Sequence, residues 1–359
     1  MDKNTTYIGM DLGTYKTSVT SSTGVRDVML TAVGWPKDAI ARTMLGREVV
    51  FGKDIIEHRL ALNVVRPFEK GFLKYSTPDK KANTNGKVDQ HKEAARLLVE
   101  HAVAQTRPPL GKPIVGVIGA PSRATAENKK VILEAARNIF DSVLIVSEPF
   151  TIAYGMNRLT DTLVIDIGAG TIDLCPIHGT FPSEEDQVTL SVGGDLVDEQ
   201  FYNQLRTTYP DAQLTLNMAR EIKEKYGVAN DAKENAVVSL PVGGKPKQFD
   251  VTRPLQSACK MLVKAILDGL QELISRSDPE YQQRMLSNII LGGGGSQLKG
   301  LDLAIEEGLK EYGGGKVKRV GDAVFAGAVG ALKLAMSMPT ESWQQLQQTD
   351  KREPALAKV

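Results

Sequence analysis

The stretch Val164–Cys175, VIDIGAGTIDLC, decides the fold. It starts with apolar residues typical of a buried strand, carries a carboxylate at Asp166, turns through glycine-rich sequence and continues as a second strand. Ile8–Val19, IGMDLGTYKTSV, repeats this order with Asp11 in the corresponding place. The two copies predict an internally duplicated fold with two similar domains.

Each of the two turns carries groups that bind phosphate. Glycine lets backbone N–H groups approach an anion closely, and the hydroxyls of Thr14 and Thr171 add donors. The carboxylates of Asp11 and Asp166 suit Mg²⁺, which keeps several of its waters when it binds a protein. One such turn alone is typical of an ordinary hairpin, and the second copy is what favours a polyphosphate site. The motif GxxxxGK[ST] is absent from the sequence, which excludes a P-loop.

Two segments of the second half suit the adenosine part of a nucleotide. Gly292–Gly295 follows an apolar strand, and four glycines allow close approach by a flat ring or by another backbone. The alternative is a flexible turn. Lys223 and Glu224, within the predicted helix 216–226, are placed to reach ribose hydroxyls and the purine. The alternative for this pair is a solvated helix face.

Composition excludes several classes of function. The chain has 359 residues, of which 42% are hydrophobic, enough for a large core and two or three domains. Its 44 Lys and Arg balance 43 Asp and Glu, so we expect no nucleic-acid partner. The N-terminus reaches a strand without an apolar or basic amphipathic segment, which predicts a cytoplasmic protein without direct membrane insertion. Two distant cysteines and four scattered histidines predict neither a disulfide framework nor a zinc site.

Hydrophobic periodicity predicts alternating strands and helices, as in sheets with crossover helices. Predicted strands cover 7–13, 17–22, 27–32, 113–119, 142–146, 162–167, 171–178, 237–240, 248–251 and 288–291; predicted helices cover 94–106, 124–140, 199–208, 216–226, 254–275, 301–309 and 323–336. Ser76–Glu93 has almost no apolar residues and is predicted to be a solvated loop. The Gln- and Lys-rich end of the chain is predicted to be a polar, partly disordered tail.

Taken in order along the chain, these motifs resemble the actin, MreB and Hsp70 ATPase superfamily. Each motif alone is common, whereas the ordered set is not, and the resemblance covers nearly the whole chain. The motifs are the turn at Asp11, Ser147–Gly155, the turn at Asp166, Val192–Glu199 and the run from Gly292. Ile222–Lys225 also resembles the adenosine-contacting segment of actin.

Within this superfamily, the chain resembles the magnetosome-associated bacterial actins. The stretches that carry this resemblance are Gly34–Asp38, Val146–Phe150, Asp166–Thr171 and Trp343–Gln347. The chain departs from that family at Ser76–Glu93 and after Gln348, where it is longer. Both departures are polar, so they concern partner contacts and filament packing rather than the nucleotide site.

The resemblance implies an α/β architecture: the actin-like, ribonuclease H-like duplicated two-domain ATPase fold, with a nucleotide cleft between the domains. Domain I is expected at 1–147, with a small inserted subdomain at about 34–75. Domain II is expected at 148–338, with a small inserted subdomain at about 195–255. The polar C-terminal tail is expected at 339–359.

The resemblance also implies ATP or ADP and Mg²⁺ as cofactors, with Asp11, Glu148 and Asp166 as catalytic residues. Asp11 and Asp166 are expected to hold Mg²⁺ through water, and Glu148 to orient the attacking water. The alternative for Glu148 is a carboxylate that stabilises a helix N-terminus. Lys16 is expected to add a cation near the phosphates, although its spacing from Asp11 differs from that of the actin lysine, and a surface lysine is its alternative. The nucleotide-binding set is Gly13, Thr14, Lys16, Gly168, Ala169, Gly170, Thr171, Gly193, Gly194, Lys223, Glu224, Gly292, Gly293, Gly294 and Ser296.

The implied function is that of a bacterial cytoskeletal ATPase. Hydrolysis is expected to be slow in the monomer and faster in a head-to-tail homopolymer, whose filaments lie alongside magnetosomes and contact magnetosome-associated proteins. An MreB-type or plasmid-segregating actin is the nearest alternative. A small-molecule kinase of this fold needs an acceptor pocket with an aspartate base, for which Asp195 or Asp198 is the candidate. An Hsp70-like chaperone needs a further β-rich peptide-binding domain, for which we expect no room.

Overall fold

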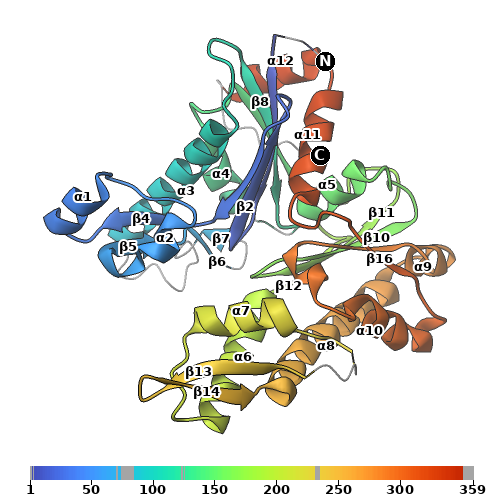
Figure 1. Cartoon of the computed structure of the whole chain (residues 1–359). Helices are drawn as coiled ribbons and strands as arrows, with labels where there is room; N and C mark the ends of the chain where they lie inside the picture. Colours follow the sequence, from blue (N-terminus) through green and yellow to red (C-terminus); the bar gives the residue numbers. More distant parts are fainter. Residues whose placement is uncertain are drawn as a thin grey trace. The chain divides into compact units, whose positions relative to one another are not determined.

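Figure 1 shows the computed structural model of the protein, which describes residues 2, 4–69, 72–73, 85–122, 124, 126–230 and 235–350. The chain folds into two compact units. Unit 1 contains Met1–Leu159 and Val324–Val359, and unit 2 contains Thr160–Ala323. Unit 1 is therefore built from both ends of the chain, whereas unit 2 is one continuous segment.

Unit 1 is built on one five-stranded sheet, made of β1 (Thr6–Leu12), β2 (Lys16–Ser21), β3 (Arg26–Leu30), β8 (Ile114–Ala120) and β9 (Ser142–Ser147). The strand order is β3-β2-β1-β8-β9. β1 pairs antiparallel with β2 and parallel with β8, and β9 pairs parallel with β8. The carboxyl ends of three parallel strands therefore meet at one edge, which is where α/β sheets bind ligands.

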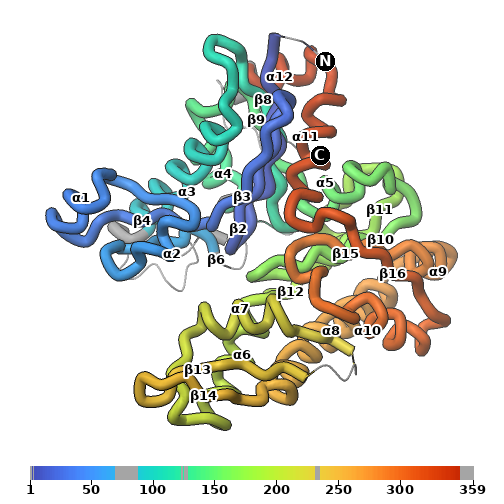
Figure 2. The backbone as a smooth tube through the Cα atoms, in the orientation of Figure 1, coloured from blue at the N-terminus to red at the C-terminus, as the bar shows by residue number. Residues whose placement is uncertain are grey.

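Helices cover this sheet: α3 (Asn85–Gln105), α4 (Ala126–Ala136), α5 (Glu148–Gly155), α11 (Ala326–Ser337) and α12 (Thr340–Asp350). Ile8 and Met10 of β1 pack in a core with Leu98 of α3. Gly9 points to the other face, where a Cβ would overlap the backbone of Ala328 in α11. Figure 2 shows the red α11 returning from the C-terminal part of the chain to lie beside the blue N-terminal strands.

Residues 33–65 of unit 1 form a smaller substructure with its own core. β4 (Val33–Pro36) pairs antiparallel with β5 (Leu62–Val65), and α1 (Ala39–Leu45), α2 (Asp54–Glu57) and the 3₁₀ helix η1 (Arg59–Ala61) lie between them in the chain. This core is made of Val50, Ile55 and Leu62 together with Ala32, which directly precedes β4. The two-residue strands β6 (Phe68–Glu69) and β7 (Phe72–Leu73) follow. The expected inserted subdomain at about 34–75 falls on this region.

Unit 2 repeats the plan of unit 1 with β10 (Thr162–Ile167), β11 (Ile172–Ile177), β12 (Val188–Leu190), β15 (Ile289–Gly292) and β16 (Val317–Arg319). The strand order is β12-β11-β10-β15-β16. β10 pairs antiparallel with β11 and parallel with β15, as β1 does with β2 and β8. The duplication predicted from the two acidic turns is therefore confirmed by the topology.

The other elements of unit 2 enclose a large core. They are α6 (Gly194–Thr208), α7 (Leu216–Tyr226), β13 (Val237–Val242), β14 (Lys245–Asp250), α8 (Thr252–Arg276), α9 (Pro279–Leu286), α10 (Leu301–Gly308) and the 3₁₀ helices η3 (Gly294–Gln297) and η4 (Leu309–Tyr312). The 25-residue α8 buries one side, including Leu262 and Ile266, against Phe201 of α6 and the sheet. β13 and β14 form a separate hairpin.

Two sequence predictions were wrong in part. The loop prediction for Ser76–Glu93 fails at 85–93, which form the start of α3; residues 76–84 lie outside the described residues. A helix that is already nucleated extends at low cost through polar residues, so low apolar content did not end it. The predicted polar tail begins as α12, in which Trp343 is buried and donates from Nε1 to the carbonyl of Ala335 at 3.3 Å. Residues 351–359 lie outside the described residues.

The division of the chain also differs from the predicted boundaries. The boundary between the first segment of unit 1 and unit 2 lies after Leu159 rather than after residue 147. α5 therefore belongs to the same unit as the sheet that precedes it. α11, expected in domain II, belongs to unit 1 because its glycine-rich face packs on β1 and α5.

Candidate functional site

In unit 1, the sheet brings Asp11 and Glu148 to the same edge. Asp11 lies near the end of β1 and is in register with Gly119 of β8. Glu148 begins α5 directly after β9 and is buried. A Cβ on Gly119 would stand 3.2 Å from Cγ of Glu148, so a glycine at this position leaves room for the glutamate. The strand register thus explains why two carboxylates separated by over a hundred residues both lie beside Gly119.

The predicted phosphate turn of unit 1 is tight. A Cβ on Gly13 would stand 2.7 Å from the carbonyl oxygen of Lys16, so this position requires glycine. Thr14 is half-buried in the turn. The side chain of Lys16 is exposed, and its Nζ lies 5.9 Å from the centre of the Tyr15 ring. This placement matches the surface lysine that was the alternative, and a phosphate contact by Lys16 remains a prediction.

Asp11 lies against the first turn of α11, which the sequence reasoning missed. A Cβ on Gly327 would stand 2.5 Å from Oδ2 of Asp11, so the glycine lets the helix backbone reach the carboxylate. Burial raises the pKa of Asp11 to about 7. Positive charge nearby stabilises the ionised form of this carboxylate. The N-terminus of α11 supplies part of that charge, and a bound cation would supply more. The run of small residues at 326–331 is the sequence feature that could have indicated this close contact.

We expect Asp11→Asn to stabilise the nucleotide-free protein above neutral pH. The pKa of Asp11 is raised above its unfolded value near 4, so ionisation costs stability progressively as pH rises from about 4 to about 7. Asparagine removes this cost, and the free energy of unfolding should rise on the order of 2–4 kcal/mol at pH 8 and much less at pH 5. Urea unfolding of the variant and the wild type at pH 5 and pH 8 measures this difference in the free energy of unfolding. Equal differences at the two pH values would contradict the assignment.

In unit 2, Asp166 occupies the place that Asp11 has in unit 1. It lies on β10, is buried, and is in register with Gly292 of β15. Gly293 has a φ of 71°, and a Cβ there would overlap Oδ1 of Asp166, so this position needs glycine for two reasons. The buried Ser296 donates from Oγ to the carbonyl of Gly293 at 2.7 Å and fixes the turn. The glycine run is thus an ordered turn packed on Asp166 rather than a flexible one.

The turn between β10 and β11 is joined to the start of α6. The N–H of Gly168 donates to the carbonyl of Thr171 at 2.9 Å and closes the turn. The N–H of Gly194 donates to the carbonyl of Gly168 at 3.0 Å. A Cβ on Gly193 would stand 2.5 Å from the carbonyl oxygen of Ala169. The structure therefore brings the predicted residues 168–171, 193 and 194 together.

Lys223 and Glu224 have different surroundings on α7. Lys223 Nζ lies 2.6 Å from Oδ1 of the fully buried Asp198 and donates to the carbonyl of Gly194 at 3.0 Å. Glu224 is exposed. Lys223 thus connects α7 to the start of α6, and the ribose contacts of both residues remain predictions.

Asp195 and Asp198 are engaged by Arg220. Its Nε donates to Asp198 and its Nη2 to Asp195, each at 2.7 Å. A catalytic base of a small-molecule kinase needs access to a substrate hydroxyl. The burial and ion pairing of Asp198 do not favour that alternative.

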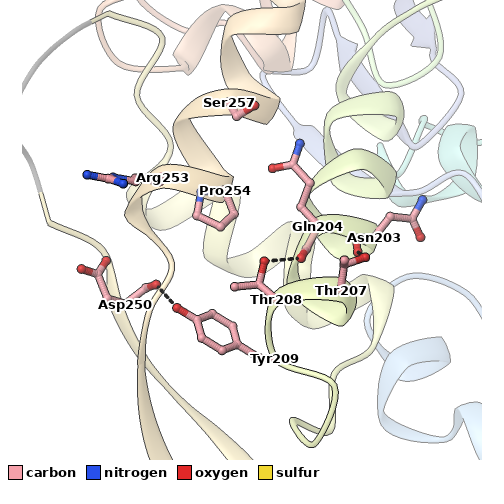
Figure 3. A pocket seen from close by; sticks show the side chains of 9 residues that line it. All are labelled: Asn203, Gln204, Thr207, Thr208, Tyr209, Asp250, Arg253, Pro254 and Ser257. Carbon is pink, nitrogen blue, oxygen red and sulfur yellow. Dashed lines mark hydrogen bonds between the residues drawn. The ribbon is translucent and has the colours of Figure 1, made fainter.

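A hollow in unit 2 lies elsewhere, at the end of α6 (Figure 3). It has a volume of about 720 Å³ and is lined by Asn203, Gln204, Thr207, Thr208, Tyr209, Asp250, Arg253, Pro254 and Ser257. The hydroxyl of Tyr209 donates to the carbonyl of Asp250 at 2.7 Å across one side of it. None of the predicted site residues lines this hollow.

Comparison with known protein families assigns the chain. A family model described as MreB/Mbl protein matches residues 82–339. The chain is an actin-like protein of the MreB/Mbl family. The actin-like protein MamK of Paramagnetospirillum magneticum is 38% identical to it over 344 residues, which cover 96% of each chain.

Solved structures of MamK are similar to this actin-like protein over nearly their whole length. A MamK double helical filament gives a TM-score of 0.87 at 38% identity, covering 93% of this chain and 99% of that chain. A non-polymerising MamK mutant bound to AMPPNP gives a TM-score of 0.71 at 38% identity, covering 94% of this chain and 100% of that chain. The predicted actin-like fold and the resemblance to magnetosome-associated actins are therefore confirmed. No helix in the described part of this MreB/Mbl family member is long and apolar enough to span a membrane.

Proposed function

We propose that this protein binds ATP with Mg²⁺, hydrolyses it slowly, and polymerises into cytoplasmic filaments that organise and position magnetosomes. The observation that carries the proposal is the 38% identity to MamK over 96% of both chains. MamK relatives have been solved as a filament and in complex with AMPPNP, a non-hydrolysable ATP analogue. The two acidic turns supply the groups that such a nucleotide needs.

Asp11 and Asp166 are the proposed holders of Mg²⁺, through water. No group of three or more His, Cys, Asp or Glu side chains in the described residues is arranged as a metal site. A single carboxylate on each turn suits a cation that retains its waters and binds phosphate oxygens. The raised pKa of Asp11 fits the same assignment, because a nearby cation stabilises the ionised carboxylate. The cation would neutralise charge on the phosphates.

Glu148 is the proposed residue that orients the attacking water. It is a buried carboxylate at the sheet edge that also holds Asp11, and the hydroxyl of Thr151 donates to its carbonyl at 2.7 Å. Phosphoryl transfer depends mainly on positioning and charge stabilisation, so a fixed carboxylate is sufficient for this role. Assembly would accelerate hydrolysis by completing the water-positioning geometry, and the nucleotide state would then time filament turnover.

The proposal is tested by adding MgATP to the purified protein and following light scattering, sedimentation, phosphate release and negatively stained images. Pelletable filaments that form with MgATP and release phosphate are the expected result. Phosphate transfer to a metabolite without assembly would contradict the filament proposal and support the small-molecule kinase alternative. Absence of nucleotide binding would refute the ATPase proposal as a whole.

Asp166→Ala should abolish ATP turnover and weaken MgATP binding. The substitution removes a proposed Mg²⁺ ligand and leaves an empty space beneath Gly293. Loss of charge stabilisation of this kind lowers turnover by about 100-fold or more. Phosphate release measures turnover. Nucleotide affinity measured at increasing magnesium concentrations reports how strongly binding depends on the cation. Asp186→Ala, an exposed aspartate of the same unit, is the matched control. A magnesium response equal to that of the wild type would contradict the assignment of Asp166.

A further inference from the structure

The phosphate turn of unit 1 lies beside a basic side chain outside the predicted site. The guanidinium carbon of Arg66 lies 4.9 Å from the centre of the Tyr15 ring, and Nζ of Lys16 lies 5.9 Å from the same centre. Tyr15 is half-buried, and its carbonyl accepts from the N–H of Thr31 at 2.8 Å. Two cations therefore flank an anchored ring within the turn 13–16.

The backbone that carries Arg66 is held firmly. Arg66 directly follows β5, whose last residue, Val65, is buried and in register with Val33 of β4. Pro67 follows, which fixes its own φ and restricts the residue before it to extended conformations. Phe68 is buried in the main core of unit 1. An exposed, long cationic side chain is thus presented to the turn from a rigid position.

The chemistry of this pair suits a phosphate. An arginine that stacks on an aromatic ring uses the face of its guanidinium, whereas it binds phosphate through its N–H edge, so the two contacts are compatible. Arginine stays charged at all physiological pH values, and its guanidinium can donate two parallel hydrogen bonds to the oxygens of one phosphate. The carboxylates of Asp11 and Glu148 at the same sheet edge repel a phosphate, which makes a nearby cation more valuable.

We propose that Arg66 binds the terminal phosphate of ATP and sets the preference of this site for ATP over ADP. The proposal rests on the nucleotide-binding function proposed above. ATP carries one phosphate more than ADP, so a side chain that contacts only this group separates the two nucleotides. Tyr15 acts as the platform that holds the guanidinium in position. Arg66 thereby couples the terminal phosphate to the substructure 33–65, since it directly follows β5, the last strand of that substructure.

The test compares the affinities of MgATP and MgADP for nucleotide-free protein, by displacement of a fluorescent ADP analogue at concentrations too low for assembly. Arg66→Ala should weaken ATP binding by roughly tenfold or more and change ADP binding by less than about twofold. Arg66→Lys keeps the charge but loses the planar pair of donors, so it should recover part of the preference. Arg59→Ala removes an exposed arginine of the neighbouring substructure 33–65 and should behave as wild type.

The alternative is that Arg66 only holds the turn in shape. In that case Arg66→Ala and Tyr15→Leu would weaken ATP and ADP equally, and this result overturns the proposal. An unchanged ratio of the two affinities in Arg66→Ala also overturns it, while the ATPase function stands if the wild type binds both nucleotides. A wild type that binds neither nucleotide overturns both. Circular dichroism establishes folding, and Arg66→Gln takes the place of the alanine variant if that variant is unfolded.

Discussion

Replacing Glu148 by glutamine should lower the rate of phosphate release by about 100-fold or more, and nucleotide affinity should stay within about threefold of wild type. Glutamine keeps the size of the buried side chain and its packing against Gly119, but it loses the negative charge that orients water. Single-turnover phosphate release with MgATP measures the first effect. Displacement of a fluorescent ADP analogue measures the second.

Glu57→Gln is the control for this experiment, because Glu57 is an exposed glutamate at the end of α2 in the same unit. It should release phosphate at the wild-type rate. Wild-type turnover in Glu148→Gln would remove the proposed role of Glu148. A parallel loss of nucleotide binding would indicate instead that the carboxylate stabilises the start of α5, which was the structural alternative.

Gly330→Val should destabilise the protein by about 3 kcal/mol or more. A Cβ on Gly330 would overlap the carbonyl group of Thr151, and a Cβ on Gly155 would stand 3.0 Å from the Cα of Gly330. α5 and α11 thus meet backbone to backbone at this point, and a larger side chain forces them apart. Because the same two helices carry Glu148 and Gly327, nucleotide affinity should fall as well.

Urea unfolding followed by tryptophan fluorescence measures this change, since Trp343 is buried against α11. Val329→Ala is the matched control: the side chain of Val329 is 44% exposed on the neighbouring position of the same helix. It should change the free energy of unfolding by less than about 0.5 kcal/mol. A Gly330→Val variant with wild-type stability would show that the two helices can separate without cost.

Features encoded locally were predictable from the sequence. The alternation of apolar residues and the glycine turns identified β1, β2, β10 and β11, because a strand followed by a tight turn is specified by neighbouring residues. The same reasoning placed Asp11 and Asp166 at strand ends, and the duplication followed from their repeated pattern. Glu148 came only with the resemblance to a known superfamily, because its position depends on the register of β8 and β9.

Features that depend on distant contacts were not predictable. The short elements of 33–65 have too few residues each for a clear periodic pattern. Gly327 is separated from Asp11 by most of the chain, and no local pattern links the two. Lys223 lies on a helix with charged neighbours, and its pairing with Asp198 required the packing of α6 on α7. The beginning of α3 was hidden because a polar helical turn and a polar loop have similar composition.

The return of α11 to the N-terminal sheet has a consequence for how the protein is made. A ribosome releases β1 and β8 long before α11, so the face of β1 that carries Gly9 stays uncovered until almost the whole chain has emerged. Unit 2 is continuous and can complete its own core while the chain is still being synthesised. Co-translational folding should therefore finish the second unit first. The contact between Asp11 and Gly327, and with it the proposed nucleotide site, forms only after synthesis has passed α11.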